Sequence, residues 1–180
     1  MAAQPSVSDF MVDVRSMLTQ GGVDSPALTR VGDLLATTFA GRGFSPEASL
    51  RAMHKSDSSA SVLQSDSDGL TLVLGEFSAA AETPVHDHGA WGVACIVRGS
   101  DRYRHYHPPK AENPVPQLRF ERILGPGDFV TWLDPPDDIH SQQGIGEAAL
   151  EIILFGKNVM AMPRRYYDLA SGRVTTALPQ

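Results

Sequence analysis

Three histidines are the residues of this chain most suited to bind a metal ion. His86 and His88 are separated by one residue, and side chains two apart in an extended strand leave the same face, so both imidazoles can converge on one ion. His140 lies in the segment Asp-Asp-Ile-His-Ser, after a Pro-Pro turn and 52 residues beyond His88. That separation lets the chain run out and return beside the first pair. The hypothesis is a metal site formed by His86, His88 and His140.

The segments that must position these histidines have the pattern of a β-barrel. From Ser59 onward, short apolar or alternating runs are separated by turns rich in Gly, Pro, Asp and Ser, which is typical of antiparallel sandwiches and barrels. About eight strands in one closed unit predict a double-sheet jelly roll, the cupin architecture. The expected strands are Ser59–Gln64, Leu70–Phe77, Trp91–Arg98, Asp101–His107, Gln117–Leu124, Phe129–Leu133, Ile139–Gln142 and Ala149–Phe155.

Helices are expected before the barrel. Apolar residues recur at helical spacing from residue 7 to about residue 53, with Phe10 and Val14 in one piece and Leu28 and Val31 in the next. The residues after Val174 are expected to be loosely ordered. The predicted organisation is an N-terminal helical cap over residues 1–55, a cupin barrel over 56–170 and a C-terminal tail over 171–180.

Composition limits the possible partners and the cellular location. With 180 residues the chain fits one domain. A formal charge of −6 and a pI near 5.4 argue against a nucleic-acid or anionic-membrane partner. Cys95 is the one cysteine in the sequence, which excludes an internal disulfide framework and Cys-rich zinc sites. No signal-peptide pattern and no membrane-spanning run are found, so a cytoplasmic protein is expected, with its oligomeric state left open.

The two histidine segments resemble the paired motifs of the cupin family. Cupins carry a Gly, then His-x-His, a Glu three or four residues later and a Gly after six more, and their second motif is Pro-x-Gly-x-x-His. This chain supplies His86, His88 and Gly99 for the first motif, and Pro135 and His140 for the second. Departures from the pattern are Ala80 at the first Gly, Gly92 or Val93 at the Glu, and Asp137 at the Gly of the second motif.

The missing glutamate directs the resemblance to one subfamily. A three-histidine cupin with His-Asp-His and no Glu is similar to the cysteine dioxygenase-type family of thiol dioxygenases, and this similarity covers roughly Ser59 to Tyr167. It implies Fe(II) held by three neutral imidazoles, with O₂ as the second substrate. Donor type alone does not select iron, because imidazole also suits Zn, Cu and Ni. Three neutral ligands leave the ion its full positive charge, which favours an anionic substrate such as a thiolate or an enolate.

The position of arginines separates two kinds of thiol dioxygenase. Cysteine dioxygenases proper carry an Arg on an early strand that pairs with the substrate carboxylate, but no Arg lies between Arg51 and the metal motif. The chain resembles the bacterial mercaptopropionate dioxygenases more closely, and the Arg that they place after the last core strand corresponds to Arg164. Its guanidinium can clamp a carboxylate with two hydrogen bonds. The alternative is that Arg164 and Arg165 form a solvated surface pair.

The last core strand departs from the family. Thiol dioxygenases carry Ser-x-His-x-Tyr there, whereas the matching positions are Glu151, Ile153 and Phe155. The pocket is therefore expected to be more apolar, unless Tyr103, Tyr106 or Tyr166 enters it from elsewhere. Phe77 matches a pocket-wall aromatic of the family, and Phe77, Phe155 and Arg164 are the expected substrate contacts.

Four further residues are not assigned to the metal or to the substrate. The family's Cys–Tyr crosslink is not expected, and Cys95 is interpreted as a small buried hydrophobe. The second His-x-His, His105 and His107, is interpreted as a strand edge or pocket rim. Asp87, between the two ligands, is expected to point to the opposite face and to fix the loop.

Together these observations predict an oxidoreductase for a small molecule. The expected reaction is Fe(II)- and O₂-dependent oxidation of a small anionic compound, first of all a thiol carboxylate to its sulfinate. The alternatives are oxidative C–C cleavage of an enolic or aromatic compound, and a non-oxidative metal-dependent cupin isomerase, lyase or binding protein. The sequence assigns no catalytic acid or base.

Overall fold

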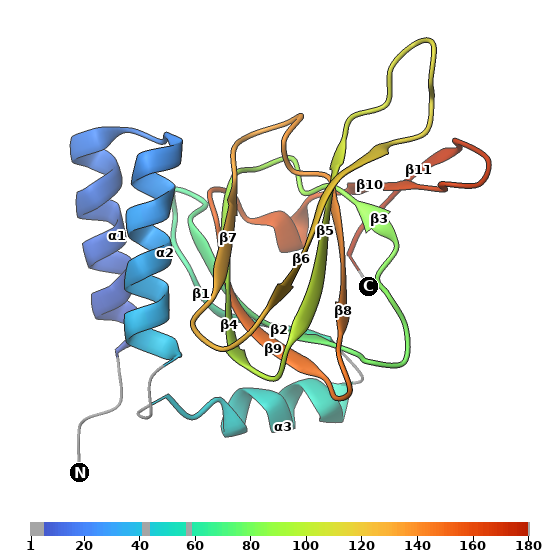
Figure 1. Ribbon diagram of the computed structural model, residues 1–180. Helices are drawn as coiled ribbons and strands as arrows, with labels where there is room; N and C mark the ends of the chain where they lie inside the picture. The colour runs from blue at the N-terminus through green and yellow to red at the C-terminus, as the bar shows by residue number, and fades with distance from the viewer. Residues whose placement is uncertain (1–5, 41–43, 57–58, 180) are drawn as a thin grey trace.

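The computed structural model describes residues 6–40, 44–56 and 59–179, and it shows three helices followed by a barrel of antiparallel strands (Figure 1). The helices are α1 (Val7–Gly21), α2 (Ser25–Phe39) and α3 (Glu47–Ser56). Ser6 and Asp24 accept hydrogen bonds from backbone N–H groups in the first turns of α1 and α2, as N-cap residues do. Within the described ranges, no helix is long and apolar enough to cross a membrane.

Two sheets face each other to form the barrel. In the first sheet the order is β1 (Ala60–Ser65), β2 (Thr71–Phe77), β9 (Ala149–Phe155), β4 (Gly92–Arg98) and β7 (Phe129–Trp132). In the second it is β11 (Val174–Ala177), β10 (Arg164–Tyr167), β3 (Val85–His86), β8 (His140–Gly144), β5 (Asp101–His107) and β6 (Gln117–Leu124). Strands β2 to β9 alone give two four-stranded sheets with crossovers between them, which is the jelly roll of cupins.

The first sheet is buried on both faces, and its inner face is the wall of the functional site. Leu72, Leu74 and Ile152 pack outward against α1 to α3, whereas Val73 and Ile153 point into the barrel. Figure 1 shows α1 and α2 side by side on this sheet, with α3 below the barrel. Burial on both faces explains why β9 is an uninterrupted apolar run except for Glu151.

The eight predicted strands are present, and three more were not expected. Strands β3, β10 and β11 extend the second sheet, and a 3-10 helix (Val159–Ala161) connects β9 to β10. The prediction of loose order after Val174 is wrong, because Val174–Ala177 pairs with Arg164–Tyr167 in an antiparallel hairpin. All four residues of β11 are exposed. Because β11 is held by backbone hydrogen bonds to β10 and buries no side chain, its sequence shows no apolar pattern.

Gly32 of α2 allows the close approach of the helix to β7. A Cβ atom at this position would lie 2.3 Å from the ring of Phe129. We expect Gly32→Ala to lower the free energy of unfolding by about 1–2 kcal/mol, because overpacking outweighs the better helix propensity of alanine. Urea denaturation measures the change, with the exposed Thr37→Ala on the same helix as a control. Stabilisation by Gly32→Ala would contradict this packing.

Candidate metal centre

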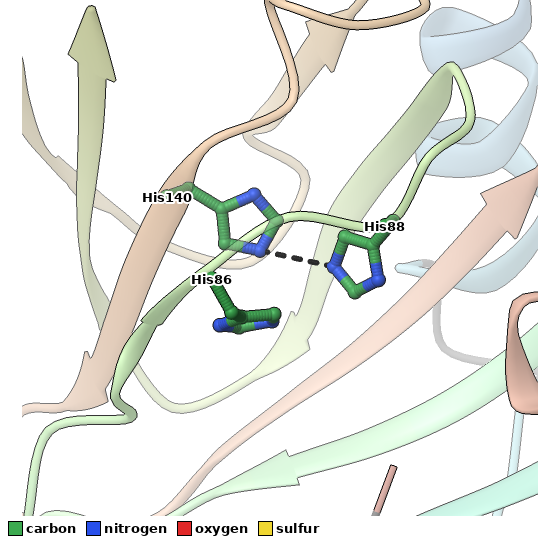
Figure 2. Close-up of side chains that lie close together, drawn as sticks. All are labelled: His86, His88 and His140. Carbon is green, nitrogen blue, oxygen red and sulfur yellow. Dashed lines mark hydrogen bonds between the residues drawn. The ribbon is translucent and has the colours of Figure 1, made fainter. Parts of the chain in front are cut away.

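His86, His88 and His140 converge inside the barrel. One nitrogen of each ring lies within 4.8 Å of the corresponding nitrogens of the other two, and the Nε2 atoms of His88 and His140 are 3.3 Å apart. Figure 2 shows the three rings turned toward one shared space from three different segments of backbone. The residues are 5%, 5% and 2% exposed, respectively. The three predicted ligands therefore form one buried cluster.

Strand register places two of these rings side by side. His86 at the end of β3 is the direct partner of His140 at the start of β8, and His140 is in turn the partner of His105 on β5. Directly opposite residues on neighbouring antiparallel strands project from the same face. Tyr166 of β10 is the partner of His86 on the other side, and its ring stacks on the imidazole with centroids 6.0 Å apart.

His88 is positioned differently from the prediction. A single strand carrying both His86 and His88 is wrong, because β3 ends at His86 and His88 lies in the following loop. One carboxylate oxygen of Asp138 accepts hydrogen bonds from the backbone N–H groups of His88 and Gly89, at 3.0 and 2.7 Å. Asp138 is two residues before His140, so this buried carboxylate fixes one ligand segment to the other.

The protonation of the rings suits metal binding. The Nδ1 atom of His86 lies 2.8 Å from the carbonyl oxygen of Pro84, which can only accept, so Nδ1 carries the proton and Nε2 keeps its lone pair. Burial lowers the pKa of His86 to about 4 and holds the pKa values of His88 and His140 well below their usual range. The three rings are therefore neutral at pH 7, the form that metal ions require.

Aromatic packing orients the other two rings. The Nδ1 atoms of His88 and His140 have no hydrogen-bond partner among the described residues. The ring of His88 lies against Phe155, with centroids 4.7 Å apart, and His140 lies against Tyr103 and Trp132, at 5.3 Å from each. Rigid neighbours thus replace the hydrogen bonds that usually orient metal-bound histidines.

Gly92, where most cupins carry a glutamate, makes room for Trp132. The two residues are direct partners in strands β4 and β7, and a Cβ atom on Gly92 would lie 2.2 Å from the indole ring. The indole N–H donates to the carbonyl oxygen of Ala90 at 3.0 Å, which fixes the ring in place. A carboxylate side chain at position 92 would have to displace this buried tryptophan, so no acidic ligand joins the histidines from β4.

A cavity of about 170 Å³ lies beside the three rings. Cavities of roughly 150 Å³ hold a benzene molecule, so the space suits a small organic ligand. Both apolar and polar side chains line it. Besides the histidines, its lining includes Val73, Gly75, Phe77, Thr83, Trp132, Gln142, Ile153, Phe155, Met160, Arg164 and Tyr166. All three predicted substrate contacts, Phe77, Phe155 and Arg164, therefore line the same cavity.

The two adjacent arginines of β10 have opposite orientations. Arg165 makes an ion pair with Asp87, whereas Arg164 lines the cavity and forms no ion pair with an acid in the described part of the chain. Its Nε has no hydrogen-bond partner among the described residues, and its Nη2 lies 3.8 Å from the sulfur of Met160. Burial lowers the pKa of Arg164, yet a guanidinium stays charged in proteins. The alternative in which both arginines lie on the surface therefore holds for Arg165 and not for Arg164.

Asp87 connects the metal loop to the strand that carries Arg164. Its side chain accepts hydrogen bonds from the backbone N–H and the Nε of Arg165, and from the hydroxyl of Tyr167 at 2.9 Å. Its own backbone N–H donates to the carbonyl oxygen of Arg165 at 3.1 Å. The predicted role in fixing the loop is confirmed, and the same contacts attach β10 to the histidine segment.

The remaining candidates lie outside the cluster. Cys95 is buried among apolar residues, and burial raises the pKa of its thiol to about 12, as expected for a small hydrophobe. His105 lines a separate cavity with Arg119 and Arg122, and His107 is exposed.

Ile153 and Phe155 are the apolar wall that the sequence predicts, while Tyr166 supplies a hydroxyl-bearing ring.

Three residues of the site were not predicted. Asp138 holds the His88 loop, Trp132 fills the place of a ligand, and Gln142 lines the cavity. Gln142 could have been found by the same spacing rule as the ligands, since it lies two residues after His140 on one strand. Trp132 and Asp138 depend on tertiary contacts that no local pattern reveals.

Comparisons with known proteins do not assign this chain to a family. No family model matches the sequence, and no curated protein matches it. A cupin-like protein from Thermotoga maritima is 22% identical over 59% of this chain and 73% of its own, with a TM-score of 0.42. An RmlC-like cupin from Ralstonia eutropha is 18% identical over 66% of this chain and 64% of its own, with a TM-score of 0.44.

An enzyme with a likeness to this chain is an oxalate oxidase in complex with the substrate analogue glycolate. It is 16% identical over 56% of this chain, with a TM-score of 0.44. The match spans 52% of the oxidase chain, about half its length. Likenesses at this level assign neither a reaction nor a substrate to the chain.

Loss of the Asp87 carboxylate should loosen β10. We expect Asp87→Asn to speed tryptic cleavage after Arg164 and Arg165 in the folded protein by about fivefold or more. The side-chain NH2 of asparagine would face N–H and O–H groups that now donate to the carboxylate, and these hydrogen bonds would be lost. Mass spectrometry of the fragments measures the rate, and Glu112→Gln, at an exposed acid, is the control. Equal cleavage of Asp87→Asn and wild type would show that Asp87 does not hold this strand.

Proposed function

We propose that this chain is a non-haem Fe(II)-dependent dioxygenase for a small anionic organic molecule. The observation that carries the proposal is the cluster of three buried neutral imidazoles beside a cavity that also contains an unpaired arginine. His86, His88 and His140 would hold the ion, and the bound metal would supply sites at which substrate and O₂ meet. The expected reaction adds both oxygen atoms of O₂ to a thiolate and gives a sulfinate.

The residues present fit a bound cation. The Nε2 atoms of His88 and His140 are 3.3 Å apart, so one neutral ring can donate its N–H to the other when no ion is bound, and a shared cation would take the place of that proton. With Gly92 in place of an acidic residue, the ligand set stays neutral. Arg164 and the ion would then both attract an anion into a cavity with few polar groups, where charge interactions are strong.

Each residue of the cavity has a part in binding. Arg164 is placed to pair with a carboxylate through two hydrogen bonds, and the Tyr166 ring covers His86. Phe77, Ile153 and Phe155 supply apolar surface to the same cavity. A thiol carboxylate satisfies both charged groups, with its sulfur toward the histidines and its carboxylate toward Arg164.

Oxidative C–C cleavage of an enolic or aromatic compound is the second candidate. The wall formed by Ile153 and Phe155 favours it, because it lacks the hydroxyl and imidazole of thiol dioxygenases. The third candidate is a non-oxidative metal-dependent isomerase or binding protein. A cytoplasmic location, a small-molecule substrate and the absence of nucleic-acid and membrane partners belong to the same proposal.

Metal content and oxygen uptake separate these functions. We expect protein purified without oxygen and loaded with Fe(II) to consume O₂ with 3-sulfanylpropanoate, and to consume much less with 2-sulfanylethanol, which has no carboxylate. His140→Ala should lose most of the bound iron, while the exposed His107→Ala keeps it. Stoichiometric zinc with no substrate-dependent O₂ uptake would overturn the dioxygenase proposal, and full iron content in His140→Ala would exclude His140 as a ligand.

The carboxylate contact has its own test. We expect Arg164→Ala to raise KM for the carboxylate substrate about 10- to 100-fold, because a charge-assisted pair in a buried site contributes roughly 1.5–3 kcal/mol to binding. Arg164→Lys should recover part of this loss, since lysine keeps the charge but not the planar fork. Steady-state kinetics measures both, and an unchanged KM in Arg164→Ala would place the carboxylate elsewhere.

A further inference from the structure

Gln142 is a polar group of the cavity that neither the metal ligands nor Arg164 account for. It follows His140 by two residues on β8 and therefore projects from the same face of the strand. Its backbone N–H donates to the hydroxyl of Thr83 at 2.9 Å, and its backbone carbonyl accepts from the N–H of Thr83 at 2.8 Å. Since the backbone N–H and carbonyl of Gln142 already have hydrogen-bond partners, its side-chain amide is the polar group that it contributes to the cavity.

Glu151 fixes the orientation of this amide. The Nε2 of Gln142 donates to both carboxyl oxygens of Glu151, at 2.8 Å each, across the barrel from one sheet to the other. Glu151 is 0% exposed, so water does not compete for these contacts. With the amide nitrogen held by Glu151, the carbonyl oxygen Oε1 is the atom left for a ligand, and it accepts no hydrogen bond from the described residues.

A second buried carboxyl, on Asp101, supports this arrangement. Asp101 is also 0% exposed, and neither of its side-chain oxygens has a hydrogen-bond partner in the described protein. Burial raises the pKa of Asp101 to about 7, and burial together with Asp101 raises the pKa of Glu151 well above its usual range. A proton shared by the two carboxyls reduces the repulsion between them.

We propose that Gln142 is the hydrogen-bond acceptor of the substrate site, so that the favoured substrates carry a hydroxyl or amino group besides the anionic group bound by Arg164. This inference rests on the proposed function, because it takes Arg164 as the anchor of the anion. A buried acceptor that a ligand leaves unpaired costs binding energy, so the site discriminates against otherwise similar acids that lack a donor.

The test compares carboxylates of similar size on the Fe(II)-loaded protein without oxygen. Titration calorimetry gives Kd for propanoate, its 2- and 3-hydroxy derivatives, alanine and 3-aminopropanoate. At least one donor-bearing acid should bind wild type about tenfold more tightly than propanoate, the ratio that one hydrogen bond of about 1.4 kcal/mol gives. The hydroxy and amino acids show which donor the site prefers.

Variants test whether Gln142 causes the preference for donor-bearing acids. In Gln142→Leu the advantage over propanoate should fall below twofold, and Kd for propanoate should stay the same or fall, because no acceptor is left unpaired. Glu151→Gln should also weaken it at least threefold, because a neutral amide can pair with either end of Gln142 and no longer fixes Oε1 toward the ligand. Gln143→Leu is the matched control, since the Gln143 side chain contacts Ala79 and Arg102 instead. Thermal unfolding shows that each variant is folded.

Three outcomes would overturn the inference. If donor-bearing acids keep their advantage in Gln142→Leu, the preference arises elsewhere, for example from chelation of the metal. If wild type binds all five acids equally and Arg164→Ala weakens them all, only the role of Gln142 is wrong. If no acid binds to the iron-loaded protein, the carboxylate anchor of the proposed function is wrong as well.

Discussion

The arrangement of this barrel depends on two imidazole nitrogens that face each other at 3.3 Å in a buried space. Burial lowers the pKa values of both rings, so at neutral pH a single proton between the two nitrogens makes this contact a hydrogen bond. The contact is maintained from outside, by Asp138 on the His88 loop and by the pairing of β3 with β8. A site held in this way before an ion arrives needs little rearrangement to bind one.

The packing of Trp132 against Gly92 determines the charge of the site. Trp132 occupies the volume beside Gly92 in which a carboxylate ligand would lie, and its indole is fixed by the carbonyl of Ala90. The ligand set is consequently neutral, and the nearest cationic side chain, Arg164, has no acidic partner among the residues described. If the three histidines hold a cation, this cation and the Arg164 guanidinium would both favour an anionic ligand in the cavity.

The sequence predicted the parts of this site that follow a local rule. The spacing of His86, His88 and His140 identified the cluster, and the resemblance to the thiol dioxygenases indicated Ile153 and Phe155, both of which line the cavity. Counting along the chain from Phe155 indicated Arg164, with a solvated surface pair of Arg164 and Arg165 as the alternative. The Asp87 contacts decide this, since they direct Arg165 outward.

Features set by long-range contacts could not be predicted. Strand β3 has two residues, and β11 is fully exposed, so neither has an apolar pattern of its own. The role of Asp138 appears only when the loop of His88 lies next to the start of β8. The orientation of the Gln142 amide likewise depends on Glu151 in the opposite sheet.

X-ray absorption spectroscopy of the Fe(II)-loaded protein tests the metal centre most directly. Three imidazole nitrogens should account for the protein ligands of the iron, and the number should fall to two in His88→Ala, which removes the ligand held by Asp138. An unchanged imidazole count in that variant, or a carboxylate among the ligands of the wild-type protein, would contradict the three-histidine centre.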